Sequence, residues 1–327
     1  MAERLTVLFL PHPLGPSMLK PAKDDVVAAI GDRHDLHILD YDQPIAPQFD
    51  GVDVVIDHGG SAGTREMADA AAGVVRLWQI LGTGFDHFDL GYWRSKNLSV
   101  ANCPGIFSAV ALAECAMMFS LMLARQYPVT QTNLKQGELY RPVGMELDGL
   151  KLGIIGFGAS GIELARRAVP FGLKMSVIDI RDVGADEASE FGLEFVGKPE
   201  DLDAVIATSD FLSLHLHLND ETRHIIDARR LSLMKSTAFL INVARGALVD
   251  EAALIEALAK GEIAGAGLDV FGQEPPDLNS VVFSLPNVIA TPHISGGTDG
   301  TSRKRAGAAA ENVDRIAAGL EPLYLIS

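Results

Sequence analysis

LGIIGFGASGIELARRAVPFGLKMSVID, residues 152–179, is the stretch that decides the fold of this chain. It begins with a short apolar run and passes through three glycines spaced G-x-G-x-x-G. A helical pattern follows from Ile162 to Phe171, and a second apolar run ends in an acid. Strand, glycine turn, helix, strand and acid is the order of the βαβ unit that binds the pyrophosphate and ribose of a dinucleotide. The sequence therefore predicts a dinucleotide-binding α/β fold.

The three glycines have different predicted tasks. Gly156 permits the tight turn, Gly158 lets the backbone approach the phosphates, and Gly161 lets helix and strand pack closely. The N-terminus of the helix then presents N–H groups and the positive end of its dipole to an anion. With 32 glycines in the chain, a glycine-rich turn of some other α/β protein is the alternative reading. The flanking strand, helix and acid favour dinucleotide binding.

The acid at the end of the stretch bears on which dinucleotide binds. Asp179 lies 18 residues beyond Gly161, close to the usual distance of about 20. A carboxylate accepts hydrogen bonds from a ribose 2′-hydroxyl and repels a 2′-phosphate, so NAD is favoured over NADP. Arg181 is near enough to leave NADP open as the less favoured alternative.

Composition limits the partners and the compartment. A chain of 327 residues suggests about two domains. With 27 basic and 43 acidic residues, the net charge is −16, so nucleic-acid and membrane partners are not expected. Cys103 and Cys115 are the only cysteines, which argues against a disulfide framework. The apolar run Leu5–Leu10 is too short for a signal peptide. We expect a cytoplasmic protein.

The rest of the chain alternates short apolar runs with helical patterns, which predicts doubly wound parallel sheets. Predicted strands outside the quoted stretch are 5–10, 36–39, 52–57, 75–80, 99–101, 211–218, 238–242, 265–270 and 288–290. Predicted helices are 24–30, 110–125, 202–207, 227–234, 250–260 and 298–319. Residues 126–150 are polar and indicate a connector.

Three segments that follow predicted strands carry side chains suited to a nicotinamide dehydrogenase. Such an enzyme needs a cation for the substrate carboxylate, a proton donor and acceptor, and a group that tunes it. Arg245 can fork onto a carboxylate and the adjacent carbonyl oxygen. A histidine such as His293 can both give and take a proton, and Glu274 can fix its tautomer and stabilise the imidazolium. Taken singly, each residue has a plainer interpretation. Arg245 could form a structural ion pair, His293 could be a hydrogen-bonded turn histidine, and Glu274 could be a solvated loop acid.

At these residues the chain resembles a known family, the D-isomer-specific 2-hydroxyacid dehydrogenases, which include D-lactate, glycerate/hydroxypyruvate and 3-phosphoglycerate dehydrogenases. The resemblance runs from about Leu81 to the C-terminus. The matching segments, in order, are ILGTGFDHFDL, NCPG, ALAE, LGIIGFGASG, MKSTAFLINVARGALVDEAAL, AGAGLDVFGQEPP and ATPHISGGT. The resemblance implies that Arg245 binds substrate, that His293 is the acid–base, and that Glu274 is its partner.

The resemblance adds further site residues to those predicted from the glycine motif. It implies that Asp269 holds the nicotinamide amide, and we expect no metal. The implied cofactor site consists of Thr83, Gly156, Gly158, Ala159, Ser160, Gly161, Asp179, Val243, Ala244, Asp269, His293 and Gly296. The implied substrate site consists of Gly60, Ser61, Thr83, Gly84, Arg245 and His293.

The family architecture implies two Rossmann-like doubly wound domains. Residues 1–103 and 292–327 would form a smaller, flavodoxin-like substrate domain, and residues 104–291 an NAD domain inserted into it. A homodimer would be built partly on the helix over residues 110–125. The chain departs from the family at Ala159-Ser160, where Arg-Ile is common, and at His217, where proline is usual. His215 and His217 lie two apart on a predicted strand, so a metal pair is the alternative to a wall of the cofactor site.

The expected reaction is the reversible reduction of a small 2-oxo acid to a D-2-hydroxy acid. The glycine-rich turns suit glyoxylate, hydroxypyruvate or pyruvate. A 3-phosphoglycerate dehydrogenase is an alternative that only Arg65, beside the 58–64 turn, supports. Formate oxidation would not need a histidine paired with Glu274. An NAD-sensing binding protein or corepressor is the alternative from another class, against which the complete trio argues.

Overall fold

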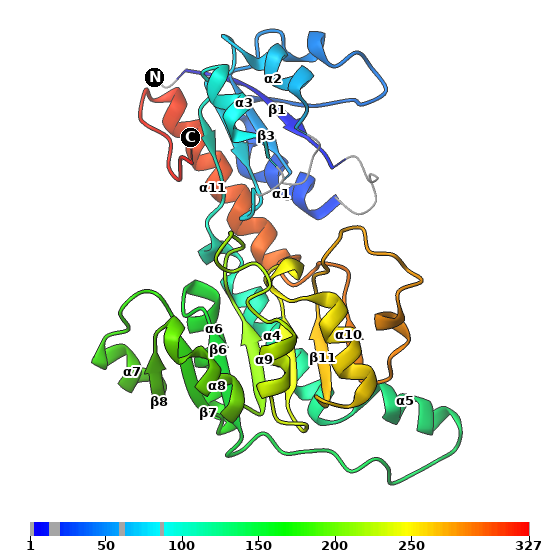
Figure 1. Ribbon diagram of the computed structural model, residues 1–327. Coiled ribbons are helices and arrows are strands. Elements are labelled where there is room, and N and C mark those ends of the chain that lie inside the picture. The colour runs from blue at the N-terminus through cyan, green and yellow to red at the C-terminus, as the bar shows by residue number, and fades with distance from the viewer. Residues whose placement is uncertain (1–2, 13–19, 59–62, 86–87, 327) are drawn as a thin grey trace. The chain divides into compact units, whose positions relative to one another are not determined.

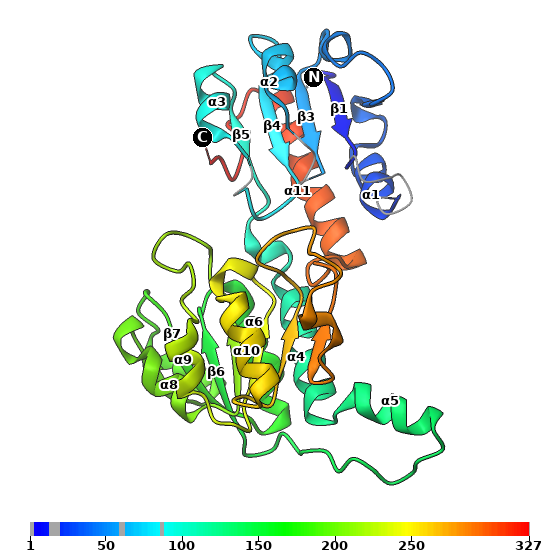
Figure 2. The same ribbon diagram turned by 45° about the vertical axis from the view of Figure 1, so that its right-hand side comes forward.

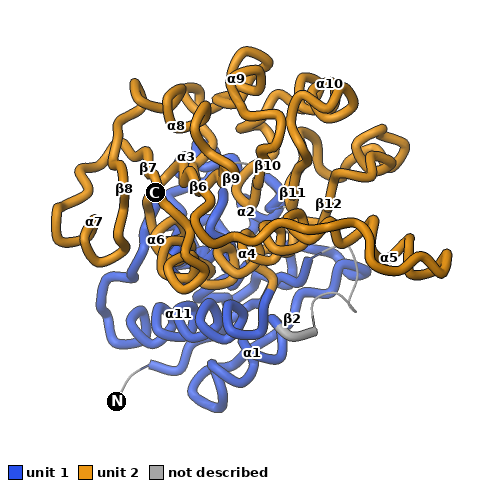
Figure 3. The backbone as a smooth tube through the Cα atoms, turned by 90° about the horizontal axis from the view of Figure 1, so that it is seen from below, with its two compact units in different colours: residues 1–107, 298–327 blue, residues 108–297 orange. Residues whose placement is uncertain are grey.

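The computed structural model describes residues 3–12, 20–58, 63–85 and 88–326. The chain forms two compact units: residues 1–107 with 298–327 make unit 1, and residues 108–297 make unit 2 (Figure 3). The sequence predicts that the chain passes from one domain to the other at 103/104 and at 291/292. In the structure the units divide at 107/108 and at 297/298. His293 therefore belongs to the same unit as Arg245 and Glu274.

Unit 1 contains a five-stranded parallel sheet in the order β2-β1-β3-β4-β5. This is the flavodoxin-like order, as predicted. The strands are β1 (Thr6–Leu10), β2 (Asp35–Ile38), β3 (Val54–Asp57), β4 (Leu77–Ile80) and β5 (Val100–Ala101). The helices are α1 (Lys20–Ile30), α2 (Arg65–Ala71), α3 (Leu90–Ser95) and α11 (Asp299–Ala317). One core cluster joins the sheet to α1 and α11, and another joins it to α2 and α3.

Unit 2 contains a seven-stranded parallel sheet in the order β12-β11-β10-β9-β6-β7-β8. The chain runs outward from β6 in one direction through β7 and β8, and in the other through β9 to β12, so the switch point lies between β6 and β9. The strands are β6 (Lys151–Ile155), β7 (Lys174–Ile178), β8 (Leu193–Gly197), β9 (Phe211–Leu214), β10 (Phe239–Asn242), β11 (Gly265–Leu268) and β12 (Val288–Ala290).

Helices cover both faces of the unit 2 sheet (Figures 1 and 2). Buried side chains of α4 and α6 form one core cluster, and those of α8, α9 and α10 form the other. The helices are α4 (Ala109–Ala124), α5 (Tyr127–Lys135), α6 (Ala159–Ala168), α7 (Ala185–Phe191), α8 (Leu202–Thr208), α9 (Ala228–Leu233) and α10 (Glu251–Lys260). The predicted fold class is confirmed in both units.

Two local predictions were wrong, and β8, α2, α3 and α7 were not predicted. The strand predicted over 211–218 ends at Leu214, so His215 and His217 lie beyond it and share no strand face. The connector 126–150 contains α5, an exposed helix with no buried residue to give it an apolar pattern. The strand β8 was missed because it is an edge strand with mostly exposed side chains, which weakens the alternation from which strands are recognised.

The glycines of the quoted stretch show why the βαβ unit needs them. Gly156 has φ of +94°, a conformation that L side chains rarely adopt. A Cβ on Gly161 would lie 2.2 Å from the carbonyl oxygen of Gly156, so the start of α6 packs directly on the end of β6. A Cβ on Gly158 would meet no described heavy atom within 4 Å.

We expect Gly161→Ala to lower the free energy of unfolding by about 1–3 kcal/mol, because the added methyl overlaps a backbone oxygen that cannot move without parting α6 from β6. Chemical denaturation of the two proteins measures this difference. The matched control is Gly158→Ala, for which the change should stay within about 0.5 kcal/mol. Equal stability of Gly161→Ala and the parent protein would contradict the close packing.

Candidate active site

The candidate residues of unit 2 gather at one edge of its sheet. All seven strands are parallel, so the segments that follow them emerge at the same edge, where ligands bind in open α/β sheets. The glycine turn follows β6, Asp179 follows β7, Arg245 follows β10, Asp269 follows β11 and His293 follows β12.

Glu274 and His293 are in hydrogen-bond contact. The Nδ1 atom of His293 lies 2.6 Å from Oε2 of Glu274, and the backbone N–H of Phe271 donates to Oε1 over 3.0 Å. Burial acts to raise the pKa of the Glu274 carboxyl, but these hydrogen bonds and the charges of His293 and Arg245 outweigh it and hold the pKa below its usual value. The carboxylate is therefore the form that faces the imidazole at neutral pH.

Asp269 fixes the turn that carries His293. Its fully buried carboxylate accepts hydrogen bonds from the backbone N–H groups of Ile294 and Ser295 over 2.8 Å and from the Thr291 hydroxyl over 2.5 Å. The N–H of His293 donates to the backbone oxygen of Asp269 over 2.8 Å. His293 itself has φ of +54°, which this set of bonds maintains against the usual preference of the residue.

The role of Asp269 in positioning His293 was not predicted. A carboxylate offers about four lone-pair directions, so the three bonds observed leave room for the predicted contact with a nicotinamide amide, which stays a prediction.

Arg245 lies on a turn shaped by a second residue that sequence reasoning missed. The buried Asn242 side chain accepts from the N–H of Ala244 over 3.1 Å and donates to the backbone oxygen of Arg245 over 2.8 Å. A Cβ on Gly246 would lie 1.9 Å from the carbonyl of Phe271, so this turn packs directly on the segment that leads to Glu274. A polar side chain ending a buried strand, as Asn242 does, was the available signal.

The glycine turn fits a dinucleotide phosphate. Gly158 stands at the N-terminus of α6, and no side chain in the described part of the chain caps that end, so the N–H groups of Ala159 and Ser160 point outward with the dipole. Ser160, at one of the departures from the family, contacts His215: Oγ lies 3.0 Å from Nδ1. His215 also contacts the Ser213 hydroxyl over 2.9 Å.

The histidines 215 and 217 do not form a metal site in the described residues. Burial lowers the pKa of His215 to about 4, so the ring is neutral and both nitrogens are held by hydroxyls. His217 is exposed. Across residues 3–12, 20–58, 63–85 and 88–326 no group of three His, Cys, Asp or Glu side chains could hold a metal ion.

Asp179, the acid predicted to bind the ribose, is held by hydrogen bonds with its neighbours. The Asp179 carboxylate accepts from the backbone N–H of Phe157 and, over 2.8 Å, from that of Arg181. The Arg181 guanidinium donates to the Phe157 carbonyl oxygen and forms two 2.8 Å bonds with the Glu187 carboxylate. The hydrogen bonds to Arg181 lower the pKa of Glu187. The cation that could receive a 2′-phosphate is thus already paired with a carboxylate.

The remaining predicted residues belong to unit 1. Thr83 and Gly84 are partly buried and follow β4. The backbone oxygen of Thr83 accepts from the side chain of Asn102 over 2.8 Å. The predicted substrate residues Gly60 and Ser61 lie outside the described residues.

Comparison with known proteins agrees with this geometry. The model of the D-isomer specific 2-hydroxyacid dehydrogenase NAD binding domain matches residues 117–295, more than half of the 327 residues. The chain belongs to the D-isomer specific 2-hydroxyacid dehydrogenase family. This 2-hydroxyacid dehydrogenase is an NAD-dependent oxidoreductase, as the sequence predicted.

Relatives match between about three quarters and nearly all of the chain. A hydroxypyruvate reductase of Thermotoga maritima is 37% identical, over 77% of this chain and 81% of that protein. A glyoxylate reductase of Thermofilum pendens is 33% identical, over 98% of this chain and 92% of its own. The crystal structure of a glyoxylate reductase from Paecilomyes thermophila superposes with a TM-score of 0.80 at 26% identity, covering 100% of this chain and 99% of that one.

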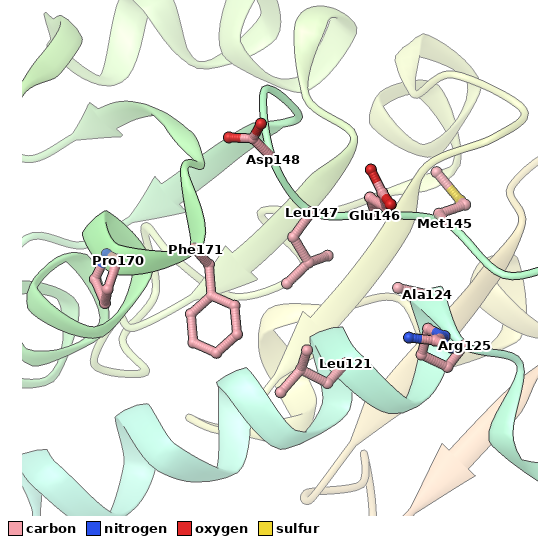
Figure 4. A pocket seen from close by; sticks show the side chains of 9 residues that line it. All are labelled: Leu121, Ala124, Arg125, Met145, Glu146, Leu147, Asp148, Pro170 and Phe171. Carbon is pink, nitrogen blue, oxygen red and sulfur yellow. The ribbon is translucent and has the colours of Figure 1, made fainter.

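Two other features of the dehydrogenase lie away from the trio. Figure 4 shows a pocket of about 330 Å³ between the end of α4 and the segments that precede β6 and β7, with Phe171 beside Leu121. Because these segments lead into the strands, the pocket is at the opposite edge of the sheet from His293. No single helix in the described part of the chain could cross a membrane, although α4 and α5, which meet at a 52° bend, pass the length and composition test as a pair.

We expect Glu187→Gln to lower the KM for NADPH by about tenfold, the effect of roughly 1.4 kcal/mol, because Arg181 loses its charged partner and can turn to a 2′-phosphate. The KM for NADH should stay unchanged, since Asp179 is intact. Steady-state kinetics with each cofactor measure both constants.

Glu190→Gln is the matched control, because Glu190 is an exposed acid one turn away that pairs with Arg166 instead. The proposed restraint on Arg181 would be contradicted if Glu187→Gln left the KM for NADPH unchanged. It would also be contradicted if Glu190→Gln lowered that KM by the same factor.

Proposed function

We propose that this dehydrogenase reversibly reduces a small 2-oxo acid to a D-2-hydroxy acid, with His293 as acid–base, Glu274 as its partner and Arg245 as the substrate-binding cation. The observation that carries the proposal is the 2.6 Å contact between Nδ1 of His293 and Oε2 of Glu274, at the sheet edge that also carries the dinucleotide turn. A carboxylate in contact with one ring nitrogen leaves the other to exchange a proton with substrate.

The proton transfer follows from the pairing. With Nδ1–H directed to Glu274, the Nε2 atom of His293 is the one that gives a proton to the carbonyl oxygen in reduction and takes it back in oxidation. The carboxylate stabilises the positive imidazolium that precedes reduction. When bound, the reduced nicotinamide supplies the hydride for the 2-carbon of the substrate.

Arg245 would bind the substrate carboxylate and the carbonyl oxygen. The guanidinium of an arginine is planar and permanently charged. Asn242 and Gly246 shape the turn that carries Arg245, and they hold its backbone beside the segment that leads to Glu274. Negative charge that develops on the carbonyl oxygen during reduction would be stabilised by the same group, and removal of one such group typically costs about a hundredfold or more in rate.

In unit 1, the turn at Thr83 and Gly84 would also contact substrate. Two relatives named for hydroxypyruvate and glyoxylate support a compact substrate, and these two acids head the list of candidates. Support for a phosphorylated substrate is weaker, because Arg65 already forms an ion pair with Asp89 at 3.1 Å. A 3-phosphoglycerate dehydrogenase is therefore the second candidate.

We also propose that the enzyme is a homodimer. The segment of unit 2 that includes α5 projects from the sheet (Figures 1 and 2) and exposes Leu134, Leu139, Tyr140 and Val143 by 59–97%. Apolar side chains at such exposure mark interaction surfaces, and a second copy related by a two-fold axis is the commonest partner. Sedimentation velocity should show a dimer at micromolar concentration; a monomer that persists there would contradict the proposal.

We expect His293→Ala to lower kcat for reduction of glyoxylate or hydroxypyruvate by about 10²–10⁴-fold, because the general acid is lost, while NADH binds as in the parent protein. Absorbance at the NADH band measures turnover, and quenching of protein fluorescence measures binding. Retained turnover would reject the acid–base assignment.

Glu274→Gln is the companion variant, since it keeps His293 but removes the negative charge. The pH–rate profile for reduction should shift to lower pH, because the protonated ring loses the carboxylate that stabilises it and gives up its proton sooner as pH rises. An unchanged profile would contradict the pairing.

A further inference from the structure

Unit 1 contains a buried arginine that has no acidic partner among the described residues. Arg305 lies on α11, and its Nε atom is buried with no hydrogen-bond partner in the described residues. Its Nη2 atom donates to the Thr83 hydroxyl over a long 3.3 Å. Burial lowers the pKa of Arg305, and only the Cys103 thiol acts in the opposite direction. Among the described residues, no carboxylate acts on the pKa of this guanidinium.

A second unpartnered group faces the same region. His58, which follows β3, has a buried Nδ1 atom without a partner among the described residues. Burial and the neighbouring charges of His12 and Arg305 lower the pKa of His58 to about 4. A buried donor without an acceptor costs roughly 1–3 kcal/mol, so the Nε–H of Arg305 calls for an acceptor that the described residues do not supply.

These groups share one edge of the unit 1 sheet. Thr83 follows β4, His58 follows β3 and Cys103 follows β5, all at the carboxyl ends of parallel strands. That edge is where ligands of such sheets bind. On an arginine, Nε–H and one Nη2–H point in parallel from the same side of the plane and match the two oxygens of a carboxylate. In Arg305 these are the unpartnered atom and the atom held only by the long bond to Thr83.

We propose that Arg305 is an anion-binding residue of unit 1, which receives an anionic group of the 2-oxo acid beside Thr83. The inference rests on the proposed function for its ligand, but the site consists of unit 1 residues alone. The anionic group is either the carboxylate of the 2-oxo acid or a second anionic group farther along the substrate. In both cases the ligand neutralises a cation that folding has left buried and unpaired.

Kinetics at saturating NADH test the proposal with the intact parent enzyme and three variants: Arg305→Met, Arg305→Lys and Arg303→Met. Arg305→Met should raise the KM by roughly 10- to 100-fold, the effect of losing a charged hydrogen-bonded pair, and should change kcat by no more than about twofold. Arg305→Lys should recover part of the loss, since it restores the charge without the fork. Arg303 is exposed and paired with Asp299 on the same helix, so Arg303→Met should behave as the parent.

The substrate panel identifies which anionic group is bound. Glyoxylate and hydroxypyruvate carry one carboxylate, oxaloacetate and 2-oxoglutarate carry two, and 3-phosphohydroxypyruvate carries a carboxylate and a phosphate. A KM that rises for every substrate would assign Arg305 to the shared carboxylate. A rise confined to the substrates with two anionic groups would assign it to the second group. A KM unchanged for all five would overturn the proposal.

Stability separates ligand binding from a structural role. If Arg305 serves a ligand, Arg305→Met removes an unpaired buried charge, and the melting temperature of the free protein should stay equal or rise. A lower melting temperature together with an unchanged KM would overturn the proposal in favour of a structural role.

Calorimetric titration of oxamate into the NADH complex gives a readout without turnover. In Arg305→Met, the dissociation constant of oxamate should rise by the same factor as the KM. A parent enzyme that reduces none of the 2-oxo acids would reject the proposed function, whereas a parent that reduces them equally well with Met at 305 would reject only this inference.

Discussion

The buried carboxylate of Asp269 is the constraint on which the candidate site depends. An ionised group with no exposed surface is costly unless hydrogen bonds compensate it, and here the compensating donors all come from the segment 291–295. These hydrogen bonds offset the cost of burying the carboxylate, and they hold the turn over residues 291–295 against the end of β11. His293 is held with a positive φ as a result, and its ring meets Glu274.

The trio is assembled by backbone packing as much as by charge. Gly246 has no room for a side chain because the carbonyl of Phe271 occupies that space, so the turns of Arg245 and Glu274 are in direct contact. Asn242 satisfies the polar groups that this close packing buries. A chain with a net charge of −16 can attract an anionic substrate only through locally placed cations, such as Arg245 in unit 2 and Arg305 in unit 1.

Cofactor preference rests on a similar restraint. Asp179 and Arg181 stand two residues apart and would favour opposite dinucleotides if both were available. The bonds from Arg181 to Glu187 and to the Phe157 carbonyl occupy the cation, while the carboxylate of Asp179 stays partly exposed at the strand end. This agrees with membership of a family with an NAD binding domain.

The sequence by itself determined the fold class, the βαβ unit and its glycines, because hydrophobic period and turn chemistry are local properties that survive without tertiary context. It also singled out Arg245, Glu274 and His293, since each follows a predicted strand. It failed at β8 and α5, whose exposed side chains carry little apolar pattern, and at the end of β9, where the apolar run continues after the ladder stops. Only the tertiary structure decided that Asp269 anchors the His293 turn, that Glu187 pairs with Arg181, and that Arg305 is buried without a carboxylate. Those properties depend on which distant segments meet, and no spacing along the chain encodes that.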